Sequence, residues 1–173
     1  DLPVNLGLAG AFQAGLKYAY VKGYSYAIQF DADGQHRPEF ISSMLERIKQ
    51  GYDIVIGSRF VNERKGKSLR MLGSKMITVA IKMTTGVRVA DPTSGLRMFS
   101  EKMIREFAQN LNYGPEPDTV SYLLKNGAKV SEVPVRMEER QAGESYLNLA
   151  NSGKYMIKML TSILFVQNFR KRG

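Results

Sequence analysis

Short apolar runs alternate with helix-like segments along most of this chain of 173 residues, and no other feature restricts its fold as strongly. Runs with the length and composition of strands lie at 26–30, 53–57, 87–90, 96–99 and 129–135. Helical spacing predicts helices at 5–22, 38–51, 71–84, 101–110, 119–125 and 152–169. Pro134 indicates either that the last strand lies at a sheet edge or that the strand ends there. This order predicts an α/β fold in which helices flank a sheet.

An acidic loop follows the first predicted strand directly. Asp31 and Asp33 are two residues apart, so in an extended chain their carboxylates project to the same side. The repulsion between them is relieved by a divalent cation, and oxygen ligands suit Mg²⁺ or Mn²⁺. Gln35 adds a neutral oxygen at the next position on that side. Since open α/β sheets bind ligands beyond the carboxyl ends of their strands, we predict a metal site at Asp31, Asp33 and Gln35.

Several basic and hydroxyl side chains are predicted near the same edge. Arg59 follows the second buried strand, and a guanidinium there can bind two phosphate oxygens at once. Arg70 and Ser74 lie one helical turn apart, and a glycine-bearing loop contains Arg140 and Ser145. Taken singly, each arginine is more often a solvated surface charge. Together with a metal, the set predicts a diphosphate site that would offset the charge on a leaving nucleoside diphosphate.

The composition restricts the classes of function. The 25 Lys and Arg residues exceed the 16 Asp and Glu residues, and the resulting net charge of +9 favours anionic partners. The absence of Cys and the single His36 exclude disulfides, thiolate metal sites and His-rich zinc sites. An alternative is a non-catalytic basic module that binds anions or nucleic acid. We do not expect nucleic acid as a partner, because no basic patch is interleaved with aromatic residues and the acidic loop would repel a phosphate backbone.

Several motifs, in order, resemble the family 2 glycosyltransferases, which have a GT-A fold. The resemblance is carried by residues 31–38 (DADGQHRP), 57–60 (GSRF), 91–97 (DPTSGLR), 132–135 (EVPV) and 140–145 (RQAGES). It is closest to the branch of dolichol- and polyprenyl-phosphate sugar synthases. It implies a GT-A-type, Rossmann-like mixed sheet, a nucleotide-sugar donor, a polyprenyl-phosphate or glycan acceptor, and inverting transfer by single displacement. The family's first strand and nucleobase pocket should precede residue 1, so we expect residues 1–146 to form the C-terminal portion of such a domain, possessing no nucleotide site of its own.

The resemblance also implies roles for individual residues. Asp31 and Asp33 would hold the metal and the diphosphate, and Gln35 would assist the metal. Four further residues match positions that contact donor and acceptor phosphates: Arg59, Arg70, Ser74 and Arg140.

Whether the predicted site needs a general base depends on the acceptor. A sugar hydroxyl acceptor needs a base, whereas a lipid phosphate is already ionised and needs positioning cations. Glu116 and Asp118 are the carboxylates we nominate, although a solvated acidic turn at the start of a helix explains them equally well. Asp91 could be a base but is better explained as a turn residue, and His36 is better explained as structural than as a ligand.

The C-terminal segment 147–173 is predicted to be an amphipathic helix distinct from residues 1–146. Its apolar stripe is flanked by Lys154 and Lys158 and ends in three basic residues, 170–172. A membrane-spanning helix needs about 20 mostly apolar residues, which this segment lacks. Two interpretations stay open: a helix packed on its own core, or an interfacial helix on acidic headgroups. The second predicts a cytoplasmic protein held peripherally on the cytoplasmic face of a membrane.

Overall fold

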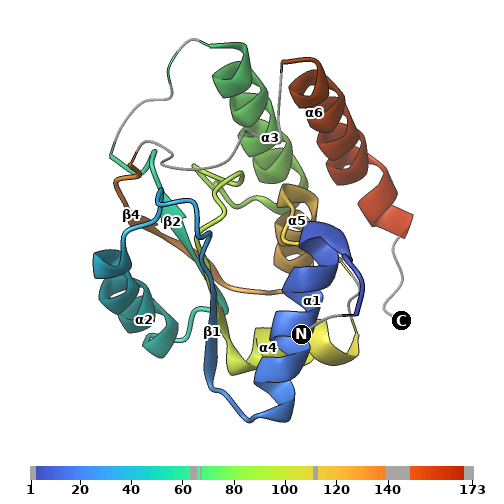
Figure 1. The fold of residues 1–173 in the computed structure, drawn as a ribbon. Helices are drawn as coiled ribbons and strands as arrows, with labels where there is room; N and C mark the ends of the chain where they lie inside the picture. The colour runs from blue at the N-terminus through green and yellow to red at the C-terminus, as the bar shows by residue number, and fades with distance from the viewer. Residues whose placement is uncertain (1–2, 63–65, 67, 111–112, 139–148, 170–173) are drawn as a thin grey trace.

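The computed structural model describes residues 3–62, 66, 68–110, 113–138 and 149–169. These residues form an α/β fold with a four-stranded mixed sheet flanked by helices, as predicted (Figure 1). The strands are β1 (Tyr26–Gln29), β2 (Ile54–Ser58), β3 (Arg97–Ser100) and β4 (Val130–Pro134), in the spatial order β1-β3-β2-β4. β3 is antiparallel to both of its neighbours, whereas β2 and β4 are parallel.

The direction of β3 determines what gathers at one edge of the sheet. Because β3 runs opposite to the other three strands, its amino end lies beside the carboxyl ends of β1, β2 and β4. The register shows this directly: Arg97, the first residue of β3, pairs with Gln29 of β1 and with Ile56 of β2. The loops that follow β1, β2 and β4 and the loop that precedes β3 therefore meet at this edge.

Helices cover both faces of the sheet and make three layers. They are α1 (Gly7–Val21), α2 (Ile41–Lys49), α3 (Leu69–Thr85), α4 (Glu101–Gln109), α5 (Pro117–Lys125) and α6 (Leu149–Leu164), with 3₁₀ turns at Pro38–Phe40 and Val166–Phe169. Alternate strand residues point to opposite faces. Val55 packs with α2 on one face, whereas Ile54 and Ile56 pack on the other face in a core that includes side chains from the remaining helices.

Two expectations about the strands need correction. Residues 87–90 form no strand, because the backbone N–H groups of Ala90 and Asp91 donate to the Glu132 carboxylate, at 2.7 and 2.8 Å, instead of to a strand partner. The strand predicted at 26–30 is confirmed in position but is not buried: it is an edge of the described sheet, and Tyr26 and Phe30 are exposed. The edge position predicted for the strand with Pro134 is confirmed.

One side of α6 is part of the core. Met159 and Ile163 are buried in the same cluster as residues of α3 and α5. Gly73 lets α6 approach α3 closely, since a Cβ atom at this position would lie 2.7 Å from Cγ of Met156. The interpretation of the C-terminal segment as a helix packed on its own core is therefore confirmed for this side. No helix among the residues that the structure describes is long and apolar enough to cross a membrane.

The loop before β3 is anchored by a buried arginine. Arg97 is 2% exposed, and its guanidinium donates to the carbonyl oxygens of Pro92 (2.8 Å), Ser94 (2.9 Å) and Pro115 (2.5 Å). The first two carbonyls belong to the loop before β3, and the third lies just before α5. One side chain therefore ties this loop to a segment 18 residues away in the sequence.

We predict that Arg97→Met lowers the free energy of unfolding by about 3 kcal/mol, because it leaves three carbonyl groups without their donor. Urea denaturation measures this change. Arg105→Met is the matched control, since Arg105 is 60% exposed and pairs with Glu101 on its own helix, and it should cost less than about 0.5 kcal/mol. Equal losses of unfolding free energy in the two variants would contradict the anchoring role of Arg97.

Candidate functional site

The acidic loop after β1 is folded by its own side chains. The backbone N–H of Gln35 donates to Oδ1 of Asp33 at 3.0 Å, which closes a tight turn. The backbone N–H of Asp31 donates to Nδ1 of His36 at 3.0 Å. His36 is buried and packs edge-on against Phe30. These contacts support the prediction that His36 is a structural residue of the loop.

His36 also shows which charges gather around the loop. Burial lowers the pKa of His36, the carboxylates of Asp31 and Asp33 act in the opposite direction, and Arg59 lowers the pKa further. A neutral imidazole fits the hydrogen bond that Nδ1 accepts. Asp31, Asp33 and Arg59, predicted from separate parts of the sequence, therefore lie within electrostatic range of one buried ring.

The loop before β3 contacts Asp31. A Cβ atom on Gly95 would lie 2.7 Å from Oδ2 of Asp31, so only glycine at this position leaves that carboxylate where it is. The contact brings residues 31 and 95, which are far apart in the sequence, to the same edge of the sheet. The position of the Asp31 carboxylate thus depends on the loop that Arg97 anchors.

Arg59 forms a two-pronged ion pair with Asp91 of the same loop. Nε donates to Oδ2 at 2.7 Å and Nη2 donates to Oδ1 at 2.9 Å. The Asp91 carboxylate is fully buried and also accepts from the Thr93 hydroxyl at 3.1 Å. Asp91 is therefore a turn residue, as favoured above, and it orients the guanidinium of Arg59. The role of Arg59 in binding phosphate stays a prediction.

The other predicted anion-binding residues lie in different places. Ser74 is buried in α3, and its Oγ lies 3.5 Å from Oγ1 of Thr93, so α3 contacts the loop before β3. Arg70 belongs to the first turn of the same helix. Arg140 and Ser145 lie outside the described residues.

The two carboxylates nominated as bases both contact the C-terminal helical segment. Glu116 accepts a short hydrogen bond from the Tyr155 hydroxyl of α6. Asp118 is buried, its Oδ2 accepts from the Ser162 hydroxyl at 2.6 Å, and its carbonyl accepts from the Gln167 amide. These contacts give Asp118 a role in holding α6. Glu116 is half-buried and is the better candidate of the two for contact with substrate.

Three residues of this region were not predicted as site residues: Arg97, Glu132 and Tyr155. Arg97 had a signal, because a charged side chain in an otherwise apolar strand must find several hydrogen-bond partners when it is buried. Glu132 had a weaker sequence signal, because it is an acidic residue within a predicted strand. Tyr155 had no sequence signal, since its partner Glu116 is 39 residues away.

The oxygen donors of the acidic loop fit a hard divalent cation. Asp31 and Asp33 are both partly exposed at the sheet edge, and the Asp31 carboxylate forms no ion pair with any described residue. No group of three or more His, Asp or Glu side chains within the described ranges could hold a metal. Magnesium, however, is commonly bound through one or two carboxylates with substrate phosphates completing its shell. The loop suits a metal that arrives with a diphosphate.

Comparison with known proteins gives a family. Residues 1–108 match the model described as glycosyl transferase family 2. The chain is 31% identical over 160 residues to polyprenol monophosphomannose synthase from Mycolicibacterium smegmatis, covering 88% of this chain and 60% of that protein. It is also 31% identical over 162 residues to undecaprenyl-phosphate mannosyltransferase from Micrococcus luteus, covering 88% of this chain and 65% of the relative.

The name of a third relative gives a different sugar. It is the UDP-N-acetylglucosamine–dolichyl-phosphate N-acetylglucosaminyltransferase of Methanococcus voltae, 32% identical over 139 residues, with 76% of this chain and 55% of that protein covered. The chain therefore spans about three fifths of the length of these curated relatives.

We predict that the Arg59–Asp91 pair is strongly coupled. Arg59→Met should lower the free energy of unfolding by about 3 kcal/mol, because it leaves a buried carboxylate without its cation. The double variant Arg59→Met/Asp91→Asn should lose about 2 kcal/mol less than the sum of the two single losses. Urea denaturation of the four proteins in the cycle measures the coupling, and additive losses would contradict it.

Proposed function

The chain belongs to glycosyl transferase family 2, and we propose that it carries the metal- and acceptor-binding part of an enzyme that transfers a sugar from a nucleotide-sugar donor to a polyprenyl phosphate. One observation carries the proposal. The acidic loop after β1, the Arg59–Asp91 pair after β2 and the loop before β3 meet at one sheet edge. The named acceptors of the relatives, polyprenol, undecaprenyl phosphate and dolichyl phosphate, support the acceptor class.

Asp31 and Asp33 would hold Mg²⁺ or Mn²⁺ at this edge, with Gln35 assisting. When bound, the cation would offset the negative charge that develops on the departing nucleoside diphosphate. The residues themselves have separate tasks: Gly95 leaves room for the Asp31 carboxylate, His36 holds the backbone of the loop, and Arg59, oriented by Asp91, holds its guanidinium in a fixed position beside it. Groups that are fixed in advance need no reorganisation as the reaction proceeds.

A phosphate acceptor needs no general base, so neither Glu116 nor Asp118 has to be available for proton transfer. An ionised phosphate oxygen is itself the nucleophile: it forms the new bond to the sugar's anomeric carbon as the bond to the diphosphate breaks. No proton has to be removed. Glu116 and Asp118 are already hydrogen-bonded to Tyr155 and Ser162, which fits such an acceptor better than a sugar hydroxyl.

The proposed lipid acceptor also indicates where the enzyme works in the cell. A polyprenyl phosphate is held in a bilayer by its hydrocarbon chain, so an enzyme acting on it works at the membrane surface. We propose a peripheral position on the cytoplasmic face, in agreement with the basic C-terminal segment.

We predict that Asp33→Ala abolishes metal-dependent sugar transfer in the intact enzyme without unfolding it. The reason is the loss of one of two carboxylates proposed to hold the cation. Transfer of radiolabelled sugar to polyprenyl phosphate with Mn²⁺ measures activity, and thermal unfolding monitors the fold. Glu39→Ala is the matched control, since Glu39 is an exposed acid near the same loop, and it should retain activity. Unchanged transfer by the Asp33 variant would refute the metal assignment.

We predict that Glu116→Gln reduces the rate of transfer to polyprenyl phosphate by less than about tenfold, because an ionised acceptor needs no base. A hydroxyl acceptor that depends on Glu116 would instead lose about 100-fold or more. Steady-state kinetics of the intact enzyme distinguish the two. Tyr155→Phe controls for the hydrogen bond that the glutamine variant weakens. A loss of transfer rate of about 100-fold or more in Glu116→Gln would favour a glycan acceptor.

A further inference from the structure

Glu132 is a charged side chain in the middle of β4, which is an edge strand of the described sheet. Its two carboxylate oxygens accept the backbone N–H groups of Ala90 at 2.7 Å and Asp91 at 2.8 Å. Because its neighbour Val133 packs beside α2, Glu132 points to the opposite face of the sheet, which α3 covers. A charged acceptor with two hydrogen bonds therefore holds the backbone at the start of the loop before β3.

Asp91 connects Glu132 to Arg59. The Asp91 carboxylate is fully buried, and it accepts from the backbone N–H of Arg59 at 3.2 Å, in addition to Nε at 2.7 Å and Nη2 at 2.9 Å. The N–H group that Glu132 holds and the carboxylate that Arg59 contacts belong to the same residue. A displacement of the Asp91 backbone would therefore displace the carboxylate and, with it, the guanidinium. Glu132 is thus linked to Arg59 through one intermediate residue.

The guanidinium of Arg59 has one edge directed away from Asp91. A guanidinium carries its N–H donors in a rigid plane. Asp91 accepts one hydrogen from Nε and one from Nη2, and the Phe60 ring lies 5.1 Å from Cζ. The edge formed by Nη1 and the second hydrogen of Nη2 points away from this carboxylate, and the Arg59 side chain is 27% exposed. Because the plane is rigid, the position of Asp91 determines the direction in which this edge meets a phosphate.

Asp91 is also connected to Ser74 of α3. The Thr93 hydroxyl has a single proton, which it donates to Oδ1 of Asp91 at 3.1 Å, so it can only accept in its 3.5 Å contact with Oγ of Ser74. Arg59 and Ser74 are both predicted to contact phosphates. Arg59 reaches Asp91 directly, and Ser74 reaches it through Thr93. The spacing between the two predicted phosphate-binding groups therefore depends on the position of Asp91.

We propose that Glu132 is a positioning residue of the transfer reaction: it holds Asp91, and through Asp91 it fixes the direction in which the Arg59 guanidinium meets a substrate phosphate. The inference rests on the proposed function for the phosphate, whereas the link from Glu132 to Arg59 is independent of it. Donors that are oriented in advance stabilise developing charge without reorganisation, so loosening Arg59 lowers the rate even when the fold persists. The alternative, that Glu132 only satisfies two backbone groups beside a sheet edge, predicts a loss of stability alone.

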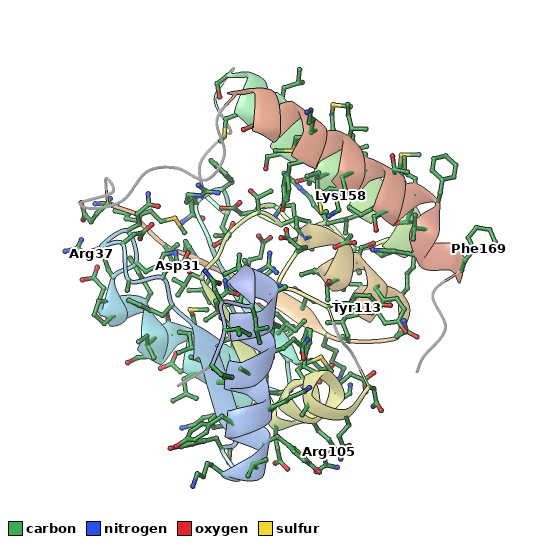
Figure 2. All side chains as sticks on the ribbon, turned by 45° about the vertical axis from the view of Figure 1, so that its right-hand side comes forward. Asp31, Arg37, Arg105, Tyr113, Lys158 and Phe169 are labelled. Atoms are coloured by element: carbon green, nitrogen blue, oxygen red, sulfur yellow. The ribbon has the colours of Figure 1, made fainter. Side chains whose placement is uncertain are left out.

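Solvent exchange of the Arg59 Nε–H, followed by ¹⁵N NMR in the 173-residue chain without substrate, tests the link. Its hydrogen bond to Asp91 should slow this exchange relative to Arg105, which is 60% exposed and lies away from Asp31 at the lower end of the molecule in Figure 2. Glu132→Gln preserves the size of the side chain but leaves only one acceptor oxygen. We expect it to raise the exchange rate of the Arg59 Nε–H at least about tenfold, the factor for losing one hydrogen bond to a charged group, and to leave that of Arg105 unchanged.

Two controls separate positioning from stability. Glu46→Gln removes the same charge from an exposed acid on α2 and should leave the exchange of the Arg59 Nε–H unchanged. The backbone amide of Ile81, which is fully buried in α3, reports the opening of the whole fold, and in Glu132→Gln its exchange should accelerate less than that of Arg59. Equal acceleration at Ile81 and Arg59 would show that Glu132 acts on stability alone and would overturn the proposal. Unchanged exchange at Arg59 would also overturn it.

Transfer of sugar to a short-chain polyprenyl phosphate by the intact enzyme tests the consequence for the reaction. Glu132→Gln should lower kcat/KM about tenfold, and Glu46→Gln should leave it unchanged. Wild-type kcat/KM in Glu132→Gln, together with faster exchange at Arg59, would refute the positioning role.

The two readouts also separate this inference from the proposed function. Faster exchange at Arg59 in Glu132→Gln, in a protein whose wild type transfers no sugar to polyprenyl phosphate, would retain the link and refute the proposed function. Unchanged exchange at Arg59, in a protein whose wild type transfers sugar, would refute the link and retain the proposed function.

Discussion

The buried guanidinium of Arg97 is the interaction on which the candidate site depends. A charge removed from water is tolerated only when its donors are satisfied, and here carbonyls from two segments do so. The guanidinium thereby joins the loop before β3 to the segment before α5. That loop in turn holds Asp91, which orients Arg59, and Gly95, which leaves room for Asp31. The buried guanidinium of Arg97 thus helps to position groups in the loops beside three different strands.

The sequence predicts the elements well and their arrangement poorly, for a physical reason. Apolar runs and helical spacing report which residues are buried locally, so the strands around 54–58 and 130–134 and the spacing of Asp31 and Asp33 were readable. The antiparallel direction of β3 was not, because periodicity contains no information about pairing. The false strand at 87–90 has the same origin: its composition suits a strand, but Glu132, from a distant part of the chain, takes the backbone donors of Ala90 and Asp91.

Glu116 and Asp118 show how a sequence can identify a residue type without its contacts. The sequence nominates these two carboxylates for proton transfer, and only the fold reveals that hydroxyl groups of α6 donate to both. Those partners are 39 and 44 residues away, beyond the reach of any local pattern. The contacts also mean that α6 is attached to the domain by polar groups beside the candidate site as well as by its apolar side. Its orientation and the geometry of Glu116 are therefore coupled.

The distribution of charge explains how a basic protein can present an acidic pair to an anionic substrate. The lysines of α3 and α6 lie on an outer surface, whereas Asp31 and Asp33 lie at the sheet edge. An anion drawn toward the molecule by its net charge of +9 still meets two carboxylates at the point of binding. Arg59 cannot fully offset them, because Asp91 already neutralises it. A diphosphate bound there, as proposed, would need further positive charge, and the proposed divalent cation would supply it.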